Sequence, residues 1–284
     1  MFRLSRPIAI AAVGALMLGA VAALVLIADP TPPAQSAISA ARAPARHDFS
    51  HINFIDRFDT LDAARWAASD GWSNGDWVEN DWRREQLSLS PQGLAITLAP
   101  SLGGRDKPYS SGEIATHQAY LYGYFEARMR VPRGDGVVTG LFTFTRPEGR
   151  ASWHEIDMEF VGSDTRVLEL AYHVEGRSKK HLVNLPFDAA DAMHTYAFEW
   201  RPDAIRFFVD NQLVHEARGA RVERMTSEQR FFVNLWNTES LHRWTGRIRP
   251  REAPWTLHVA CVAQAREYRS ASLCAPPTAD VLVN

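Results

Sequence analysis

The sequence predicts an all-β protein, built as an antiparallel sandwich or barrel. Short stretches of alternating apolar and polar residues recur after residue 60, turn signals separate them, and long helical periodicity is absent there. Hydrophobic residues make up 46% of the 284-residue chain, which is ample for a buried core. The net charge of −2 indicates no general affinity for nucleic acid or for an anionic membrane.

The N-terminus reads as a targeting segment. Two arginines precede a stretch without charges, residues 8–28, which is long for a signal-peptide core and about enough to span a bilayer. We therefore expect a signal peptide or a signal anchor over 1–28, with a candidate cleavage site in 36–43; a buried core helix is the alternative. Residues 29–48, rich in Pro and Ala, predict a flexible linker.

The basic residues before the apolar stretch should stay in the cytoplasm, so the rest of the chain should be exported. The product would be secreted or periplasmic, or tethered to the outer face of the cytoplasmic membrane through residues 8–28. An oxidising compartment favours a disulfide between Cys261 and Cys274, the only two cysteines. That bond would tie down the C-terminal tail, 271–284; the alternative is two unpaired buried thiols.

The expected strands follow one another along the chain. In YGYFEARMRV (122–131), Phe125, Ala127, Met129 and Val131 share one face. Further stretches with strand character, in chain order, are GVVTGLFTFT (136–145), VLELAYHV (167–174), a three-strand meander over HTYAFEW, IRFFVD and LVHEA (194–217), and LHVACVA (257–263). VERMTSEQR (222–230) is a candidate for a short helix.

The stretch WHEIDMEF (153–160) carries three acids at every second residue. In a strand, Glu155, Asp157 and Glu159 share one face with Trp153, and the apolar residues between them face a core. Repulsion between neighbouring carboxylates raises at least one pKa, which suits a reaction that needs one ionised and one protonated acid. Retaining glycoside hydrolysis is such a reaction, with carboxyls about 5–5.5 Å apart. A solvated acidic strand or a Ca²⁺ site are the alternatives, but a flat indole beside acids favours a sugar.

Several motifs in register resemble glycoside hydrolase family 16, in particular bacterial lichenases and exopolysaccharide endo-β-glycanases. The resemblance spans residues 54–262, through the E-x-D-x-E stretch and GWSNGDW (71–77), WR (82–83), SSGEIAT (110–116), YGYFEARM (122–129), GVVTGLFTFT (136–145), HTYAFEWRPD (194–203) and VNLWN (233–237). It implies a catalytic domain over 49–270, folded as a jelly-roll sandwich of two curved antiparallel sheets with a concave substrate cleft, after an N-terminal apolar helix.

The resemblance also implies an activity, that of a retaining endo-β-glycanase on β-1,3-1,4-glucan or a related bacterial exopolysaccharide. A β-glucan endotransglycosylase would use the same residues and remains an alternative. A non-catalytic carbohydrate-binding module, the third possibility, should have lost some of the acids, and all three are present.

By the same resemblance, Glu155 is the nucleophile, Glu159 the general acid/base, and Asp157 a helper that holds and tunes the pair. The residues expected to bind substrate are Trp153, Asn234, Trp236, Trp244, Trp72, Asn74, Glu113, Phe142, Phe144 and Glu169.

Three departures from the family pattern bear on function. Ala115 and Ala171 stand where many lichenases have a cleft Arg and a cleft Asn, and Ala260 stands where an Asp helps to hold structural calcium. We therefore expect neither a metal nor another cofactor, and weaker action on mixed-linkage glucan than a typical lichenase shows. His154 should point away from the acids. The expected partner is a polysaccharide, and the expected state is a monomer.

Overall fold

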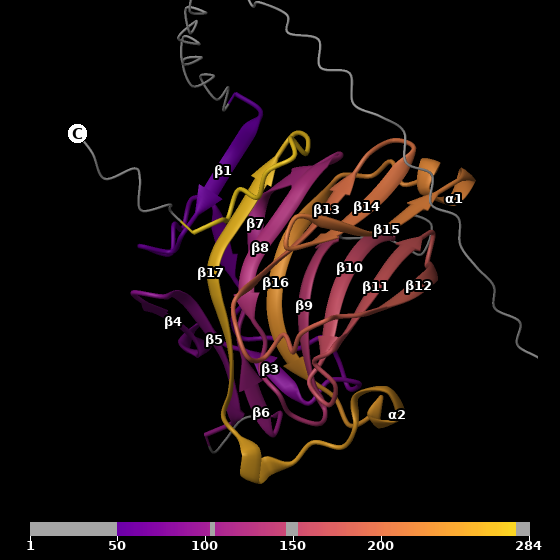
Figure 1. Cartoon of the computed structure of the whole chain (residues 1–284). Helices are drawn as coiled ribbons and strands as arrows, with labels where there is room; N and C mark the ends of the chain where they lie inside the picture. The colour runs from indigo at the N-terminus through magenta and orange to yellow at the C-terminus, as the bar shows by residue number, and fades with distance from the viewer. Residues whose placement is uncertain (1–49, 103–105, 146–152, 277–284) are drawn as a thin grey trace, which may run out of the picture. The chain divides into compact units, whose positions relative to one another are not determined.

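The computed structural model describes residues 50–102, 106–145 and 153–276, all within a compact unit that begins at Asp48. The predicted targeting segment 1–28 and the linker 29–48 lie outside the described residues. None of the helices in the described part is long and apolar enough to cross a bilayer. Seventeen strands of that part form two sheets of curved strands (Figure 1). The predicted antiparallel sandwich is confirmed.

The larger sheet holds ten of these strands. Its spatial order is β15 (Gln212–Arg218), β14 (Ala204–Val209), β13 (His194–Trp200), β8 (Gly123–Arg130), β17 (Trp255–Ala265), β5 (Gly93–Pro100), β6 (Tyr109–Ser111) and β3 (Asn80–Trp82), with β1 (Ile52–Asp56) beside β17 and β4 (Leu87–Ser90) beside β5. Among the described pairs only β3 and β6 run parallel.

The smaller sheet holds the other seven strands and carries the three acids. Its order is β12 (Arg177–Asn184), β11 (Val167–Val174), β10 (His154–Val161), β9 (Val137–Phe144), β16 (Gln229–Asn237), β7 (Glu113–Tyr120) and β2 (Trp66–Ala68). Strands β9 to β12 are neighbours in sequence as well as in space. Strand β16 returns from far along the chain and lies between β9 and β7 (Figure 1).

Helices are few and short in the described residues. They are α1 (Ala220–Glu223), α2 (His242–Thr245) and two 3₁₀ turns, Arg84–Gln86 and Pro250–Glu252. The helix expected over 222–230 is therefore wrong in extent, because α1 is a single turn and Gln229 already begins β16. From Phe231 onward alternate residues are fully buried, including Val233, and burial with a period of two favours a strand over a helix.

The hydrophobic core lies between the two sheets. Phe125 of β8 stacks on Phe198 of β13, with ring centroids 5.0 Å apart, and meets the edge of Phe231 of β16 at 5.1 Å. Strand β10 adds Ile156 and Met158, both with no exposed surface. Burying a side chain of this size contributes about 1.5–3 kcal/mol, so the core side of β10 fixes the position of the acids on its other side.

The predicted strand patterns are borne out on both sides of the core. Phe125, Ala127 and Met129 of β8 are fully buried, as their alternation predicts. The expected three-strand meander is β13, β14 and β15. Asp210 and Asn211, which join β14 to β15, both have positive φ angles (45° and 65°). This is the backbone that a two-residue hairpin turn requires, and Asn and Asp tolerate it well.

The C-terminal segment is fastened to the larger sheet at two points. Cys261 of β17 forms a disulfide with Cys274, as predicted, with Cα atoms 5.5 Å apart. Beside it Glu126, which is fully buried, accepts hydrogen bonds from the backbone N–H groups of Leu273 (3.0 Å) and Cys274 (2.9 Å) and from the hydroxyl of Ser272.

Removing the disulfide should lower stability without altering the core. The bridge spans 13 residues of sequence, and closing a loop of that size is worth about 3 kcal/mol in the chain-entropy account. We expect Cys261→Ser combined with Cys274→Ser to lower the Tm, by about 2–4 °C per kcal/mol lost. Circular dichroism on heating measures this, with the reduced wild type as control. An unchanged Tm would contradict a stabilising bridge.

Candidate active site

Strand β10 places its three acids on one face, opposite the core, which we call the acid face. Ile156 and Met158 point into the core, so Glu155, Asp157 and Glu159 point the other way. Glu155 and Glu159 are half-buried, and Asp157 is only 5% exposed. The predicted arrangement is confirmed, and it is not the solvated acidic strand that was its alternative.

Cross-strand register decides what surrounds the acids. Residues directly opposite one another in an antiparallel pair share a face of the sheet. Glu155 lies opposite Phe144 on β9 and His173 on β11. Asp157 lies opposite Phe142 and Ala171, and Glu159 lies opposite Gly140 and Glu169, on the same two strands.

Gly140, opposite Glu159, leaves room for a polar side chain. A Cβ atom at this position would lie 2.6 Å from Oδ1 of Asn234. Asn234 donates a hydrogen bond of 2.9 Å to Oε2 of Glu113, and Glu113 also accepts one of 2.7 Å from the hydroxyl of Ser69. Oδ1 of Asn234 is buried and has no hydrogen-bond partner among the described residues. It is therefore a free acceptor on the acid face, beside Glu159.

Burial dominates the electrostatics of the three acids. It raises the pKa of Glu155 to about 8 and that of Glu159 to about 7. The charge of Asp157 adds to the first effect, and the charges of Glu169 and Glu155 add to the second. Burial and the charge of Glu159 also hold the pKa of Asp157 well above its usual range. The three acids therefore retain protons near neutral pH and titrate as a group.

Hydrogen bonding distinguishes Glu155 from Glu159. The indole Nε1 of Trp153 donates to Oε2 of Glu155 over 2.7 Å, which lowers the pKa of Glu155 against the larger effect of burial. Within the described residues no N–H or hydroxyl group donates to Glu159. A hydrogen bond to the charged form stabilises it. The indole donor thus favours the carboxylate form of Glu155, although burial leaves the pKa of Glu155, about 8, above that of Glu159, about 7.

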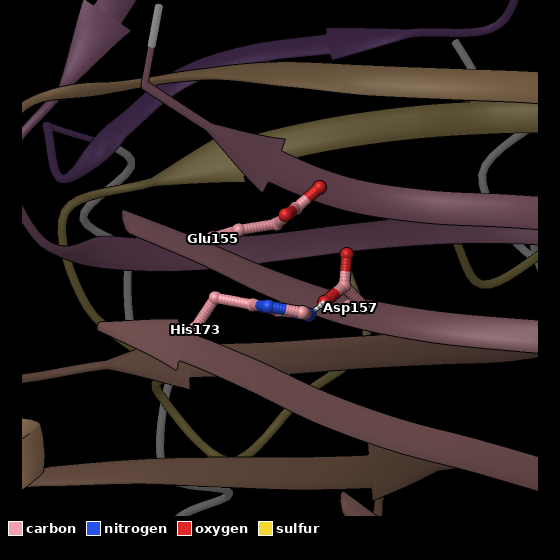
Figure 2. A group of neighbouring side chains, drawn as sticks. All are labelled: Glu155, Asp157 and His173. Atoms are coloured by element: carbon pink, nitrogen blue, oxygen red, sulfur yellow. Dashed lines mark ion pairs between the residues drawn. The ribbon is translucent and has the colours of Figure 1, made fainter. Parts of the chain in front are cut away.

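His173 joins the acids from the neighbouring strand. Its Nε2 lies 3.4 Å from Oδ2 of Asp157, and its ring lies flat against Trp153, with centroids 5.4 Å apart and planes 3° apart. Figure 2 shows Glu155 and Asp157 on β10 and His173 on β11 converging. The sequence analysis missed His173, because only the pairing of β10 with β11 brings it here.

Glu169 is held in place by two partners. It accepts a 3.0 Å hydrogen bond from Nε1 of Trp244 and a second one from the ammonium of Lys180. Lys180 also lies over the ring of Trp244, 5.0 Å from its centroid. The charge of Lys180 lowers the pKa of Asp157 and of Glu159, against the larger effect of burial. Lys180 is a second residue that the sequence analysis missed.

The predicted tryptophans fall into two groups. Trp236 packs between Trp77 and Trp244, with ring centroids 5.2 and 6.0 Å away, so this cluster borders the acid face. Trp77, 42% exposed, was not predicted. Trp72 and Asn74 instead contact Trp82: the Trp72 ring lies 6.3 Å away, and Oδ1 of Asn74 accepts a 3.0 Å hydrogen bond. Neither has a described contact with the acids.

An apolar surface lies on the other side of the acids. Phe142, opposite Asp157, stacks on Phe232 of β16 with centroids 4.9 Å apart, and Phe144 meets the edge of the same ring at 6.3 Å. The guanidinium of Arg230 lies 5.4 Å from the Phe232 centroid. All three rings are half-buried, which agrees with the prediction that Phe142 and Phe144 line the site rather than the core.

Two further predictions about position hold. His154 is buried away from the acids, where its Nδ1 accepts a 3.3 Å hydrogen bond from the backbone N–H of Ser227. Ala115 lies opposite Phe232, and Ala171 lies between Asp157 and Lys180. Both alanines are therefore on the acid face, where larger polar side chains would contact a bound molecule.

The chain is similar to known sequences of one family. A family model described as "Glycosyl hydrolases family 16" matches residues 74–253. A β-glucanase of Bacillus subtilis (strain 168) is 36% identical over 195 residues, which cover 68% of this chain and 78% of the relative. The endo-1,3-1,4-beta-glycanase ExoK of Rhizobium meliloti is 32% identical over 213 residues, 74% of this chain and 78% of the relative.

Solved structures agree as well. A prokaryotic β-1,3-1,4-glucanase (lichenase) from a mouse hindgut metagenome superposes with a TM-score of 0.70 at 28% identity, covering 75% of this chain and 98% of its own. The β-glucanase of Bacillus licheniformis gives 0.68 at 32% identity, covering 75% and 97%. The predicted jelly-roll class is thereby confirmed.

Neutralising Glu155 should stabilise the protein at alkaline pH. A group whose pKa is raised on folding, here from 4.5 to about 8, contributes stability below its unfolded pKa and loses it as pH rises through the folded value. Glu155→Gln removes this loss and keeps an acceptor for Trp153. We expect its Tm to exceed that of the wild type by several degrees at pH 8.5, and by little at pH 4. Thermal unfolding across pH measures this, and an equal difference at both pH values would contradict it.

Adding one methyl group at Gly140 should reduce activity rather than stability. The new Cβ of Gly140→Ala would displace Oδ1 of Asn234, and small misplacements within a site cost about 10- to 100-fold in rate. Gly219→Ala is the matched control, since its Cβ meets nothing within 4 Å and its φ of 105° strains any side chain. It should lower the Tm and leave kcat/KM unchanged. Equal kcat/KM for the two variants would refute a role for this space.

Proposed function

The chain belongs to family 16 of the glycosyl hydrolases, and we propose that it is a retaining endo-β-glycanase that hydrolyses internal bonds of β-1,3-1,4-glucan or a related bacterial exopolysaccharide. One observation carries the mechanism: three acids at alternate positions of a buried strand, with raised pKa values and a single indole donor at Glu155. Retaining hydrolysis needs one ionised and one protonated carboxyl. Three coupled acids that titrate as a group, with a donor at Glu155 that stabilises its charged form, supply such a pair.

The reaction proceeds in two displacements. The carboxylate of Glu155 attacks the anomeric carbon while the bond to the leaving sugar oxygen breaks, and Glu159 gives that oxygen its proton. Glu159, now ionised, then takes a proton from water, whose oxygen attacks the anomeric carbon as the ester to Glu155 breaks. Two inversions give net retention.

The neighbouring acids serve both steps. The raised pKa values let the coupled acids hold a proton in mildly acidic and neutral solution. Glu159, to which no described N–H or hydroxyl group donates, carries that proton as the general acid. The charge of Asp157 raises the pKa of Glu155, so Asp157 lies close enough to the nucleophile to tune it. The protonation state of Asp157 changes as Glu155 and Glu159 gain and lose charge during the two steps.

The surfaces beside the acids fit an equatorially substituted polysaccharide. Trp153 and Trp244, both half-buried, offer flat faces for the axial hydrogens of β-linked glucose rings, and the buried Trp236 packs behind Trp244. Each stack would contribute about 0.5–1.5 kcal/mol if aromatic pairs are a guide. Asn234 is 4% exposed and its Oδ1 is buried without a partner among the described residues, so it would have to turn outward to accept a hydrogen bond from a sugar hydroxyl.

The two alanines narrow the substrate further. Ala115 and Ala171 on the acid face offer no polar contact, and a lost hydrogen bond to a sugar costs on the order of 1 kcal/mol. The space they leave suits a substituted or branched chain. The names of the relatives, a β-glucanase and an endo-1,3-1,4-β-glycanase, support a β-linked glucan as substrate. Mixed-linkage glucan is therefore a substrate, cut less well than by a typical lichenase.

Action outside the cytoplasm accompanies this function. The disulfide between Cys261 and Cys274 belongs in an oxidising compartment, and high-molecular-weight polysaccharides lie beyond the cytoplasmic membrane. Residues 8–28 would direct export, and their retention or cleavage would decide between a tethered and a released enzyme. A catalytic monomer needs no further subunit for the chemistry described.

The stereochemistry tests the mechanism. Proton NMR of the first product from β-1,3-1,4-glucan should show a β-anomer, because both displacements invert. Glu155→Ala should lose turnover and, with azide, should release an α-glycosyl azide. Glu159→Ala should lose least on substrates with good leaving groups. An α-anomer as first product, or monosaccharide as the only product, would overturn the proposal. Starch serves as the control polymer and should remain uncut.

A further inference from the structure

Asp157 has an unused ligand atom beside an imidazole. The residue is 5% exposed, yet its Oδ2 accepts no hydrogen bond from any N–H or hydroxyl group of the described residues. We propose that a divalent transition-metal ion of the zinc class binds between Glu155, Asp157 and His173 and reversibly blocks the active site.

The three side chains have the spacing that such an ion requires. One ligand atom from each lies within 4.8 Å of the others. A tetrahedral zinc with bonds of about 2.0–2.1 Å separates its ligand atoms by about 3.4 Å. Oδ2 of Asp157 and Nε2 of His173 already stand 3.4 Å apart. The side chain of Glu155, with three rotatable torsions, can close the remaining distance.

The identity of the donors selects the ion. Two carboxylate oxygens and one imidazole nitrogen form a mixed set, which suits zinc and its neighbours among the transition metals. Calcium and magnesium prefer oxygen ligands alone, and calcium needs six to eight of them. The site therefore discriminates by chemistry, and it differs from the structural calcium site of lichenases that the sequence led us not to expect.

Trp153 holds two of the three ligands in position. Its ring stacks on His173 with planes 3° apart, which fixes the imidazole, and its Nε1 donates to Oε2 of Glu155. Oriented ligands bind a metal more tightly than free ones. His173 is 21% exposed along its side chain, so an ion can reach the site from solvent and keep a water as its fourth ligand.

Blocking follows from the identity of the ligands. An oxygen of Glu155 bound to a cation cannot attack an anomeric carbon, and the cation stands where the reacting sugar must lie. This consequence rests on the proposed hydrolysis, whereas metal binding itself does not.

Calorimetry decides whether the ion binds. Titrating ZnCl₂ into the full-length chain without an affinity tag, at pH 7, should reveal one site. In His173→Phe, whose ring can still pack on Trp153, zinc affinity should fall at least about tenfold. His173→Gln is a second variant should the first misfold. The matched control is His181→Gln, because His181 and His215 stack 3.9 Å apart elsewhere, and its affinity should equal that of the wild type.

Two outcomes would overturn the inference: wild-type zinc affinity in both His173 variants, or loss of the site in His181→Gln. CaCl₂ and MgCl₂ should give no heat at the site. Hydrolysis of β-1,3-1,4-glucan should fall with zinc, recover with a chelator, and need at least about tenfold more zinc in His173→Phe. A chain that cleaves no β-glucan would defeat the proposed function alone, since the calorimetric result stands without it.

Discussion

The structure depends on keeping three carboxylates together on one buried strand. Charges at this spacing repel one another, and burial adds a desolvation penalty to each. Strand β10 holds the acids together despite this repulsion and desolvation penalty, because Ile156 and Met158 on its other face are packed in the core with no exposed surface. Hydrogen bonds to both neighbouring strands hold it further. The same cost is useful, because a rigid strand that cannot move its acids apart must share protons among them, and proton sharing is the basis of the chemistry.

Much of this arrangement could be predicted from local sequence. Alternation in 153–160 and in 122–131 reports directly on which face of a strand is buried, and Asp210–Asn211 marks a hairpin by its tolerance of positive φ. These signals lie within a few residues of the structure they determine. The helix expected over 222–230 was wrong in extent because β16 already begins at Gln229. Just beyond the expected helix, Phe231 and Val233 are buried in the core, and burial of every second residue is typical of a strand.

The missing parts of the site share a different cause. His173 and Lys180 reach the acids through cross-strand register, and Trp77 reaches Trp236 through packing. No local sequence pattern determines which strand lies beside which. Gly140 shows the same limit: in sequence it is one glycine among 17, and only the pairing of β9 with β10 and β16 places it between Glu159 and Asn234. Residue identity predicted the acids, whereas topology determined their surroundings.

Those surroundings give the acid face two unlike sides. Beyond Glu159 lie Gly140 and the cluster of Trp77, Trp236 and Trp244, whose indoles have flat faces and N–H donors. Glu169 accepts a hydrogen bond from the indole of Trp244. Around Glu155 lie the apolar rings of Phe142, Phe144 and Phe232. The polar exceptions are Trp153, which donates to Glu155, and His173, which stacks on Trp153. A polysaccharide is directional, with different groups at the two ends of each sugar. A surface whose aromatic groups differ on the two sides of the acids distinguishes the two ends of such a chain. On the proposed mechanism the productive direction would present the anomeric carbon to Glu155 and the departing oxygen to Glu159, so the flanking aromatics would orient the chain and the acids would cleave it.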